Sequence, residues 1–296
     1  MILEIAAEPK SRHDQERLRA AVAGLAAGNP AINASEDPES AQFIIGSSDA
    51  LLLRPVIRKL KREDAIAFNA GRPQVAYRET LTRTVRFTHT LEQKDRLPHR
   101  LVTVTMEFAA APAGGGFSFV HHLPDESPFF RDAALVEAQV KIVSQCGVIA
   151  GFRLIDFRAE LIDGQRHAPI ADETAVKIAV NACYRQAVPK AGPILLEPIM
   201  KVSITVAAAA EADIVASLEG RRGRVDEIVP DSTRAIIRAS VPLANLMDYV
   251  AGKGRTDWPD FSIAMAFDRY APVPHDTSPD EHFRGAMALR EGAWLA

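Results

Sequence analysis

The sequence has 296 residues, a length that favours two or three domains. Hydrophobic residues make up 47% and charged residues 25%, and the formal net charge of -3 excludes a global basic surface, so any RNA contact must come from local patches. With two cysteines, no apolar run of transmembrane length and no secretory leader, a disulfide framework is excluded and we expect a cytoplasmic protein.

The first segment predicts the order strand, helix, strand, strand, helix, strand. Ser11, followed by Asp14 three residues later, is a variant capping box that begins the first helix. Gly28 and Pro30 stop this helix, and Pro55 fits the second helix only in its first turn. The spacing of apolar residues places the elements at 2–5, 11–28, 31–35, 42–45, 52–62 and 65–69.

The middle of the chain has a different pattern. A strand with one apolar face covers 102–108, and three successive glycines at 114–116 predict a turn. Ser127 and Pro128 are expected to open a helix that ends near Gly147. A strand at 153–161 and a helix capped by Asp172 complete a mixed α+β domain of about 125 residues, a normal domain size.

The last segment repeats the order of the first. Apolar and polar residues alternate in the predicted strands, and Pro242 precedes the second helix. The elements are expected at 200–206, 214–218, 225–229, 234–241, 243–247 and 261–267. Two copies of a split β-α-β pattern therefore flank the middle domain, which predicts the α+β class.

Several stretches in order along nearly the whole chain resemble elongation factor G, the ribosomal translocase. They are Glu8-Pro9-Lys10 with Asp14-Gln15-Glu16, the run 71–80 (GRPQVAYRET), Asp163-Gly164 with His167, the run 195–202 (LLEPIMKV), Arg221-Arg222-Gly223, Val241-Pro242-Leu243 and Phe267-Asp268-Arg269-Tyr270. The resemblance implies the family's third, fourth and fifth domains at 1–70, 71–194 and 195–296. The outer two are then ferredoxin-like, and the middle one is a ribosomal-protein-type β-α-β domain.

The resemblance also implies partners. In such factors the fourth domain reaches into the decoding centre behind the moving transfer RNA, and its neighbours link the GTPase to it and touch ribosomal RNA. The chain has no Gly-x-x-x-x-Gly-Lys-Ser/Thr loop, so we expect a monomeric, ribosome-binding protein that is not itself an enzyme and holds no cofactor. Met1 lies so near the first strand that we expect the chain to be a truncation of a longer protein. GTP and magnesium would then act only through GTPase domains of that longer protein, in cis.

Four stretches depart from the family pattern. The first tip loop, 92–100, has no glycine, and the second keeps Asp163, Gly164 and His167 but continues into 168–171 without acidic residues. The family's Glu-Leu-His-Leu-Glu reads Ala50-Leu51-Leu52-Leu53-Arg54, and its Thr-Gln-Gly element reads Arg255-Thr256-Asp257-Trp258. These departures favour a diverged paralogue that aids or modulates translocation. The alternative is an antagonist, or a ribosome protection protein of the tetracycline-resistance type.

Three groups of residues are candidates for RNA contact, because cations and loop donors bind phosphates and 2′-hydroxyls. They are Lys94, Arg96, His99 and Arg100 on the first tip loop, Asp163, Gly164, Arg166 and His167 on the second, and Arg221, Arg222 and Arg224 in a turn of the last domain. The opposing interpretation is a set of solvated, charged turns. Lys59, Lys61 and Arg62 lie at a helix end, where the helix dipole alone explains them.

A metal-dependent enzyme is a further alternative. His121, His122, Asp125 and Glu126 are residue types that bind metals. Pro124 interrupts them, however, and their spacing brings no ligands together on a helix or strand. An ordinary charged surface segment is the simpler interpretation.

Overall fold

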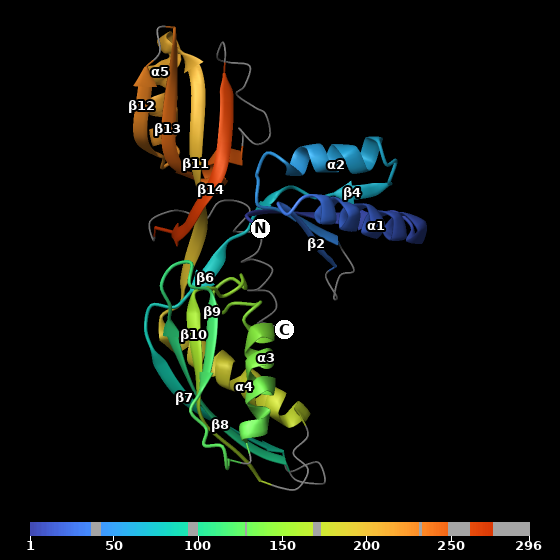
Figure 1. Cartoon of the computed structure of the whole chain (residues 1–296), viewed down its shortest axis with the longest axis vertical. Helices are drawn as coiled ribbons and strands as arrows, with labels where there is room; N and C mark the ends of the chain where they lie inside the picture. The colour runs from blue at the N-terminus through green and yellow to red at the C-terminus, as the bar shows by residue number, and fades with distance from the viewer. Residues whose placement is uncertain are drawn as a thin grey trace, which may run out of the picture. The chain divides into compact units, whose positions relative to one another are not determined.

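A computed structural model describes residues 1–36, 43–93, 100–127, 129–167, 173–230, 233–247 and 261–274 (Figure 1). These residues form three sheets, each with helices packed on it. The chain divides into two units. The first consists mainly of residues 1–76 and 197–271, and the second mainly of residues 77–196.

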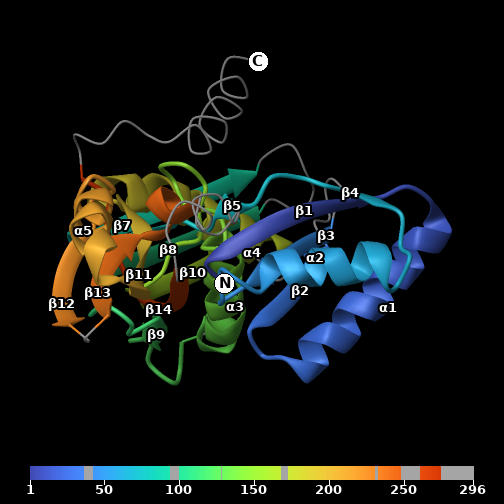
Figure 2. The same ribbon diagram turned by 90° about the horizontal axis from the view of Figure 1, so that it is seen from above.

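The first sheet has the strand order β2-β3-β1-β4, with β5 paired to β1. Its elements are β1 (Leu3–Pro9), α1 (Arg12–Gly28), β2 (Ile32–Glu36), β3 (Phe43–Ser47), α2 (Leu53–Arg62), β4 (Phe68–Ala70) and β5 (Gln74–Val75). All pairings are antiparallel, and α1 and α2 pack on the sheet (Figure 2). This is the β-α-β-β-α-β order of a ferredoxin-like domain, as the sequence predicts.

Ser11 begins α1 as its N-cap. Its hydroxyl oxygen accepts a hydrogen bond from the Asp14 amide at 3.1 Å, which satisfies one of the helix's unpaired donors. The Asp14 carboxylate accepts from the Ser11 hydroxyl at 2.6 Å and from the Ala67 amide at 3.1 Å, and these bonds lower its pKa. The predicted capping box is therefore confirmed in a modified form, because Asp14 bonds the hydroxyl and the chain preceding β4.

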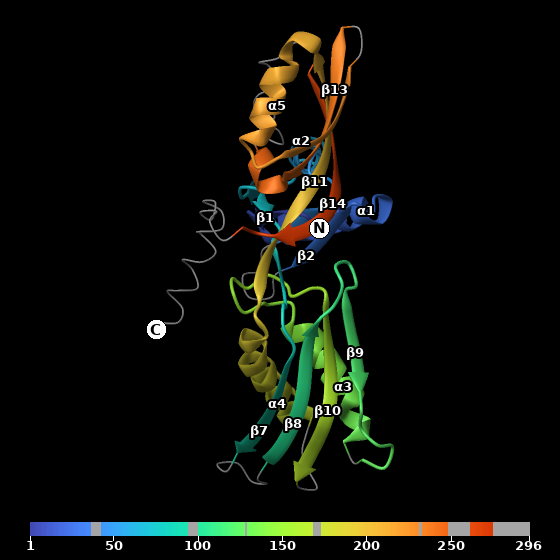
Figure 3. The same ribbon diagram turned by 90° about the vertical axis from the view of Figure 1, so that its left-hand side faces the viewer.

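The second sheet has the order β7-β8-β10-β9 and carries α3 and α4 (Figure 3). Its elements are β7 (Val85–Gln93), β8 (Arg100–Ala110), β9 (Phe117–His121), η1 (Phe130–Asp132), α3 (Ala133–Val143), β10 (Phe157–His167), α4 (Glu173–Ala187) and η2 (Val188–Ala191). β9 and β10 are parallel and α3 connects them, whereas β8 is antiparallel to both β7 and β10. The helix expected from Ser127 begins only at Ala133, after a turn and a short 3-10 segment.

Among the described residues of the second unit, Glu79 has the carboxylate that accepts the most hydrogen bonds. It lies on β6 (Arg78–Thr80), which pairs with the start of β11 (Ile194–Ala207), and it has no exposed surface. Its two oxygens accept hydrogen bonds from five consecutive backbone amides, those of Val148, Ile149, Ala150, Gly151 and Phe152, at 2.6–3.2 Å. One buried anion therefore fixes the whole turn that follows α3, because each of these donors would otherwise be unsatisfied.

The predicted glycine turn is confirmed between β8 and β9. Gly114 and Gly116 adopt φ values of 77° and 68°, which favour glycine. The Asp156 carboxylate accepts from their amides at 3.0 and 2.8 Å. The turn is thus tied to the residue that precedes β10.

The third sheet has the order β12-β13-β11-β14, the same topology as the first. Its elements are β11 (Ile194–Ala207), η3 (Ala208–Ala210), α5 (Glu211–Glu219), β12 (Arg224–Pro230), β13 (Arg234–Pro242), η4 (Leu243–Leu246) and β14 (Ser262–Pro272). The predicted repeat of the first segment is confirmed in strand order, and the chain is an α+β protein. In the part of the chain that the structure describes, no helix is long and apolar enough to cross a membrane.

Candidate nucleic-acid interface

The strands of the second sheet bring the two predicted tip segments together. Gln93 at the end of β7 pairs with Arg100 at the start of β8, and Leu101 pairs with His167 at the end of β10. The backbone positions of Arg100 and His167 therefore lie at one end of the sheet, which we call the β7–β8–β10 end (Figure 3). Lys94, Arg96 and His99 lie outside the described residues, as do residues 168–171 and 255–258.

The segment from Asp163 to His167 is a strand, which corrects the expectation of a loop. It continues β10 after a bulge between Leu161 and Asp163, and pairs with residues 101–105 of β8. An aspartate-glycine pair is typical of a turn, but here the backbone pairing with β8 keeps the segment in the strand. Asp163 is exposed, and its carboxylate accepts from the Gly164 amide at 2.8 Å.

Gly164 has a packing role. It is buried on the inner face of β10, against the ring of Phe129, which is itself 1% exposed. A Cβ atom built at Gly164 would overlap Cδ1 and Cε1 of that ring. The glycine of the predicted tip motif is therefore required by the contact between β10 and the segment before α3.

Gly164→Ala should lower the free energy of unfolding by about 2 kcal/mol, because Phe129 must leave its buried position to admit a methyl group. Gly24→Ala is the matched control, since Gly24 lies on α1 with nothing within 4 Å of the added atom. That control should stabilise the protein by about 0.5–1 kcal/mol through helix propensity. Urea unfolding followed by circular dichroism measures both, and equal effects would refute the packing role.

Arg166 has an intramolecular partner. Its Nη1 lies 3.3 Å from Oδ2 of Asp132, which precedes α3 and is 8% exposed. Burial raises the pKa of Asp132 above its usual value, the charge of Arg166 opposes this, and the charge of Glu173 adds to it. Arg166 therefore compensates a partly buried carboxylate beside the β7–β8–β10 end.

The three arginines after α5 also have partners within the third sheet. Arg221 Nη1 donates to the carbonyl oxygen of Asn245 at 2.8 Å. Arg222 Nη2 lies 2.6 Å from Oε2 of Glu197 on β11, and Arg224 Nη2 lies 2.9 Å from Oδ1 of its neighbour Asp226. The sequence suggests that these three arginines are free to bind RNA, but each of them has a partner within its own domain.

These three contacts differ strongly in burial. The side chain of Glu197 is 4% exposed, and its partner Arg222 is 29% exposed and holds a left-handed φ of 59°. Arg224 is 76% exposed. Exposed pairs contribute little to stability, whereas a buried carboxylate depends on its cation. Arg222 is accordingly a structural residue, while Arg224 presents most of its surface to solvent.

The two histidines of the alternative metal site contact other side chains. His122 Nε2 lies 2.7 Å from Oε2 of Glu160, and His121 contacts the Phe130 ring edge-on. Among the described residues, no three His, Cys, Asp or Glu side chains are grouped closely enough to hold a metal ion.

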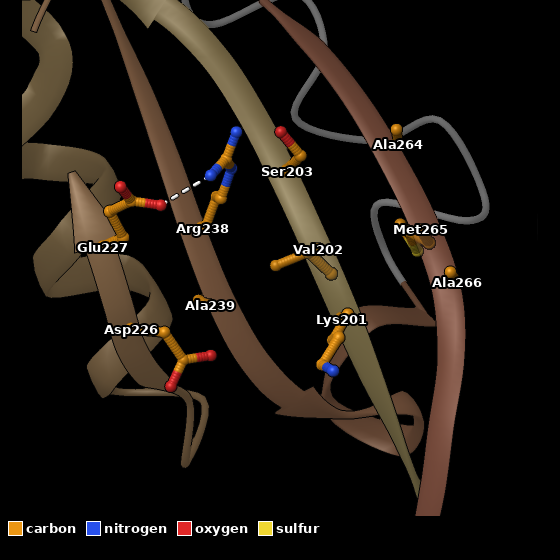
Figure 4. Close-up of a pocket in the computed structure, with 10 residues that line it drawn as sticks. All are labelled: Lys201, Val202, Ser203, Asp226, Glu227, Arg238, Ala239, Ala264, Met265 and Ala266. Carbon is orange, nitrogen blue, oxygen red and sulfur yellow. Dashed lines mark hydrogen bonds and ion pairs between the residues drawn. The ribbon is translucent and has the colours of Figure 1, made fainter. Parts of the chain in front are cut away.

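A hollow of about 420 Å³ lies on the third sheet (Figure 4). The residues that line it include Ala239, Ala264 and Ala266, together with Lys201 and Arg238. Arg238 pairs with Glu227 at 2.6 Å and Lys201 with Asp268 at 3.0 Å. Both cations that line the hollow are therefore already paired with carboxylates of the same domain.

Comparison with known proteins places all three sheets in one family. Residues 1–72 match the model of elongation factor G domain III, residues 73–192 match that of domain IV, and residues 194–258 match that of the elongation factor G C-terminus. The three matches follow the chain in order, one for each sheet. The chain belongs to the elongation factor G family.

Two relatives illustrate the match. The chain is 36% identical over 279 residues to elongation factor G from Ruegeria sp. (strain TM1040), an alignment that spans 94% of this chain and 40% of that protein. A crystal structure from Thermus thermophilus superposes with a TM-score of 0.71 at 22% identity, covering 97% of this chain and 42% of that one. The chain thus spans about two fifths of the length of these relatives.

Two features of the elongation factor G domains escaped the sequence interpretation. Glu79 lies within the family-like stretch 71–80, but no local pattern shows which amides it meets. On the outer face of the second sheet, the hydroxyls of Thr88 and Thr105 lie 2.9 Å apart and those of Thr90 and Thr103 lie 3.0 Å apart. The apolar residues Val85, Phe87 and Leu91 alternate with polar ones along β7, and this signal would have predicted that Thr88 and Thr90 share the outer face.

Proposed function

We propose that this chain is the ribosome-binding part of an elongation factor G-type translation factor, and that it aids or modulates movement of tRNA and mRNA. The observation that supports this best is the ordered match to three consecutive elongation factor G domains. The proposal assigns the chain no catalytic residue. GTP and magnesium would act through a GTPase domain outside these residues.

The β7–β8–β10 end is the part that would meet RNA. Its proposed contacts are Lys94, Arg96, His99, Arg100 and His167, with Asp163 and Arg166 beside them. The net charge of -3 makes a diffuse attraction to RNA weak, so these local cations would dominate binding. Arg221 and Arg224 would contribute from the third sheet only as secondary contacts, because both have protein partners.

Co-sedimentation with purified ribosomes tests this proposal. The unmodified chain should pellet with ribosomes at low salt and be released as salt rises from about 50 to 200 mM. The triple variant Lys94→Gln, Arg96→Gln, Arg100→Gln should bind about tenfold more weakly, with a salt slope lower by about 2–3, because each phosphate contact releases counterions.

The matched control removes three exposed cations elsewhere, by Lys141→Gln, Arg158→Gln and Arg238→Gln. Each of these exposed cations is paired with a nearby carboxylate and should affect binding by less than about twofold. Absence of any salt-sensitive pelleting by the unmodified chain would refute ribosome binding. Equal loss in both triple variants would refute the assignment to the β7–β8–β10 end.

An antagonist or ribosome protection protein is the second candidate. It is favoured by the residues Ala50–Arg54, which lack the carboxylates and histidine of the elongation factor G motif. A translation assay separates the two functions. Inhibition at amounts equal to the ribosomes supports an antagonist, relief of tetracycline inhibition supports a protection protein, and stimulation without drug supports a translocation factor.

A further inference from the structure

The Arg166 side chain lies on the inner face of the second sheet, which α3 and α4 cover (Figure 3). Successive side chains of a strand point to opposite faces, so residues two apart share a face. Gly164 is buried on the inner face, and Arg166 follows it there, half-buried. Asp163 and Gln165 occupy the exposed positions of the outer face. Arg166 is therefore directed away from its exposed neighbours and toward Asp132, which precedes α3.

The carboxylate of Asp132 lies where it needs a cation. Asp132 is 8% exposed and stands at the start of α3, to which its side chain makes no capping hydrogen bond. Within the described part of the chain, its buried Oδ2 accepts no hydrogen bond, and Nη1 of Arg166 at 3.3 Å supplies the opposite charge. A buried carboxylate that loses its cation is strongly destabilising. The pair thus commits Arg166 to Asp132.

The same guanidinium is suited to phosphate. Arginine binds carboxylate and phosphate through the same planar set of donors. The Arg166 side chain keeps 31% of its surface exposed, and its backbone pairs with Val102, two residues from Arg100. A phosphate at the β7–β8–β10 end can bind Arg166 only by taking it from Asp132. Two anions, one internal and one external, therefore compete for one cation.

From this geometry we infer that Asp132 is an autoinhibitory residue. Its carboxylate withholds Arg166 from RNA phosphates and keeps the affinity of the β7–β8–β10 end below its maximum. The inference rests on the proposed function and adds a means of regulating it. Neutralising Asp132 would give this end one more phosphate contact without adding a cation.

The test compares the whole chain with Asp132→Asn, Arg166→Gln and the double variant. Binding to ribosomes and to a fluorescent RNA duplex of about 20 base pairs is measured between about 50 and 200 mM salt. Asp132→Asn should bind about fivefold more tightly, with a salt slope steeper by about 1, because Arg166 becomes free to bind a phosphate. Adding Arg166→Gln should abolish this gain, whereas Arg166→Gln alone should change the affinity by less than about twofold.

Glu173→Gln is the matched control for charge. It removes one negative charge near Asp132, from a side chain at the start of α4 that is 77% exposed, and should change binding by less than about twofold. Asparagine is favoured at the start of a helix, so Asp132→Asn should fold. Thermal unfolding checks every variant. Asp132→Asn and the double variant leave no buried carboxylate without a cation, so their comparison decides even if Arg166→Gln alone unfolds.

The outcomes separate this inference from the proposed function. If the unmodified chain pellets with ribosomes but Asp132→Asn gains nothing, the inference is wrong and the ribosomal function stands. If Asp132→Asn and the double variant gain equally, the lost negative charge explains the gain and Arg166 is not withheld. A tenfold loss in folded Arg166→Gln would show that Arg166 already binds RNA, which also refutes the inference.

The duplex RNA measurement covers the case in which no protein pellets with ribosomes. If Asp132→Asn then gains affinity for the duplex and Arg166→Gln reverses the gain, the ribosomal function fails and the role of Asp132 stands. If no variant binds either the duplex or ribosomes, both are refuted.

Discussion

Glu79→Ala should lower the free energy of unfolding of the second unit by about 3–5 kcal/mol, the largest single effect we expect. Five backbone amides lose their acceptor at once, in a site where the side chain has no exposed surface. Unsatisfied buried donors cost about 1–3 kcal/mol each, and water entering the vacated space would offset part of that cost. Urea unfolding followed by circular dichroism gives the total.

Hydrogen exchange locates the effect of Glu79. The amides of residues 148–152 should lose protection in the alanine variant before the strands of the sheet do, because their acceptor is removed directly. Glu79→Gln should fall between the two proteins, since its amide oxygen still accepts while its NH₂ group faces donors. Glu137→Ala is the control, as Glu137 forms an exposed pair with Lys141. A loss below about 1 kcal/mol for Glu79→Ala would contradict the role assigned to the carboxylate.

Arg222→Ala should lower the free energy of unfolding of the third-sheet domain by about 3 kcal/mol. The substitution leaves the carboxylate of Glu197 buried and without its cation, which is the costly way to break an ion pair. Arg224→Ala should change stability by less than about 0.5 kcal/mol, because its pair with Asp226 is exposed. Differential unfolding of the two variants measures this contrast.

The same pair of variants decides how the arginine turn acts in binding. If Arg222 served RNA alone, its removal would leave stability unchanged and weaken ribosome binding. The structural account predicts the reverse order, with lost stability for Arg222→Ala and at most a small loss of binding for Arg224→Ala. Equal stability of the two variants would contradict it.

The sheet topology could be predicted from the sequence because its signals are local. Strand β11 alternates Val202, Ile204 and Val206 with polar residues, and Ser11 with Asp14 marks the first helix. Such signals need no knowledge of distant residues. The repeat of one pattern in the first and last segments then predicted two sheets of the same strand order, which the structure confirms.

The candidate interface could be predicted only in part, because its roles depend on partners far away in sequence. The sequence gives no sign that Arg222 is paired, because its partner Glu197 lies 25 residues away along the chain. Asp163 and Gly164 are typical of a turn, but pairing with β8 and the contact of Gly164 with Phe129 place them in a strand.

Competition between this chain and an intact elongation factor G for ribosomes tests the central claim most directly. A fixed, labelled amount of the chain is pelleted with ribosomes at low salt while unlabelled elongation factor G is added with a non-hydrolysable GTP analogue. If the chain binds the ribosome as an elongation factor G domain set, its pelleted fraction should fall as the ribosomes become saturated with the factor. A pelleted fraction that stays constant at saturating factor would contradict the account.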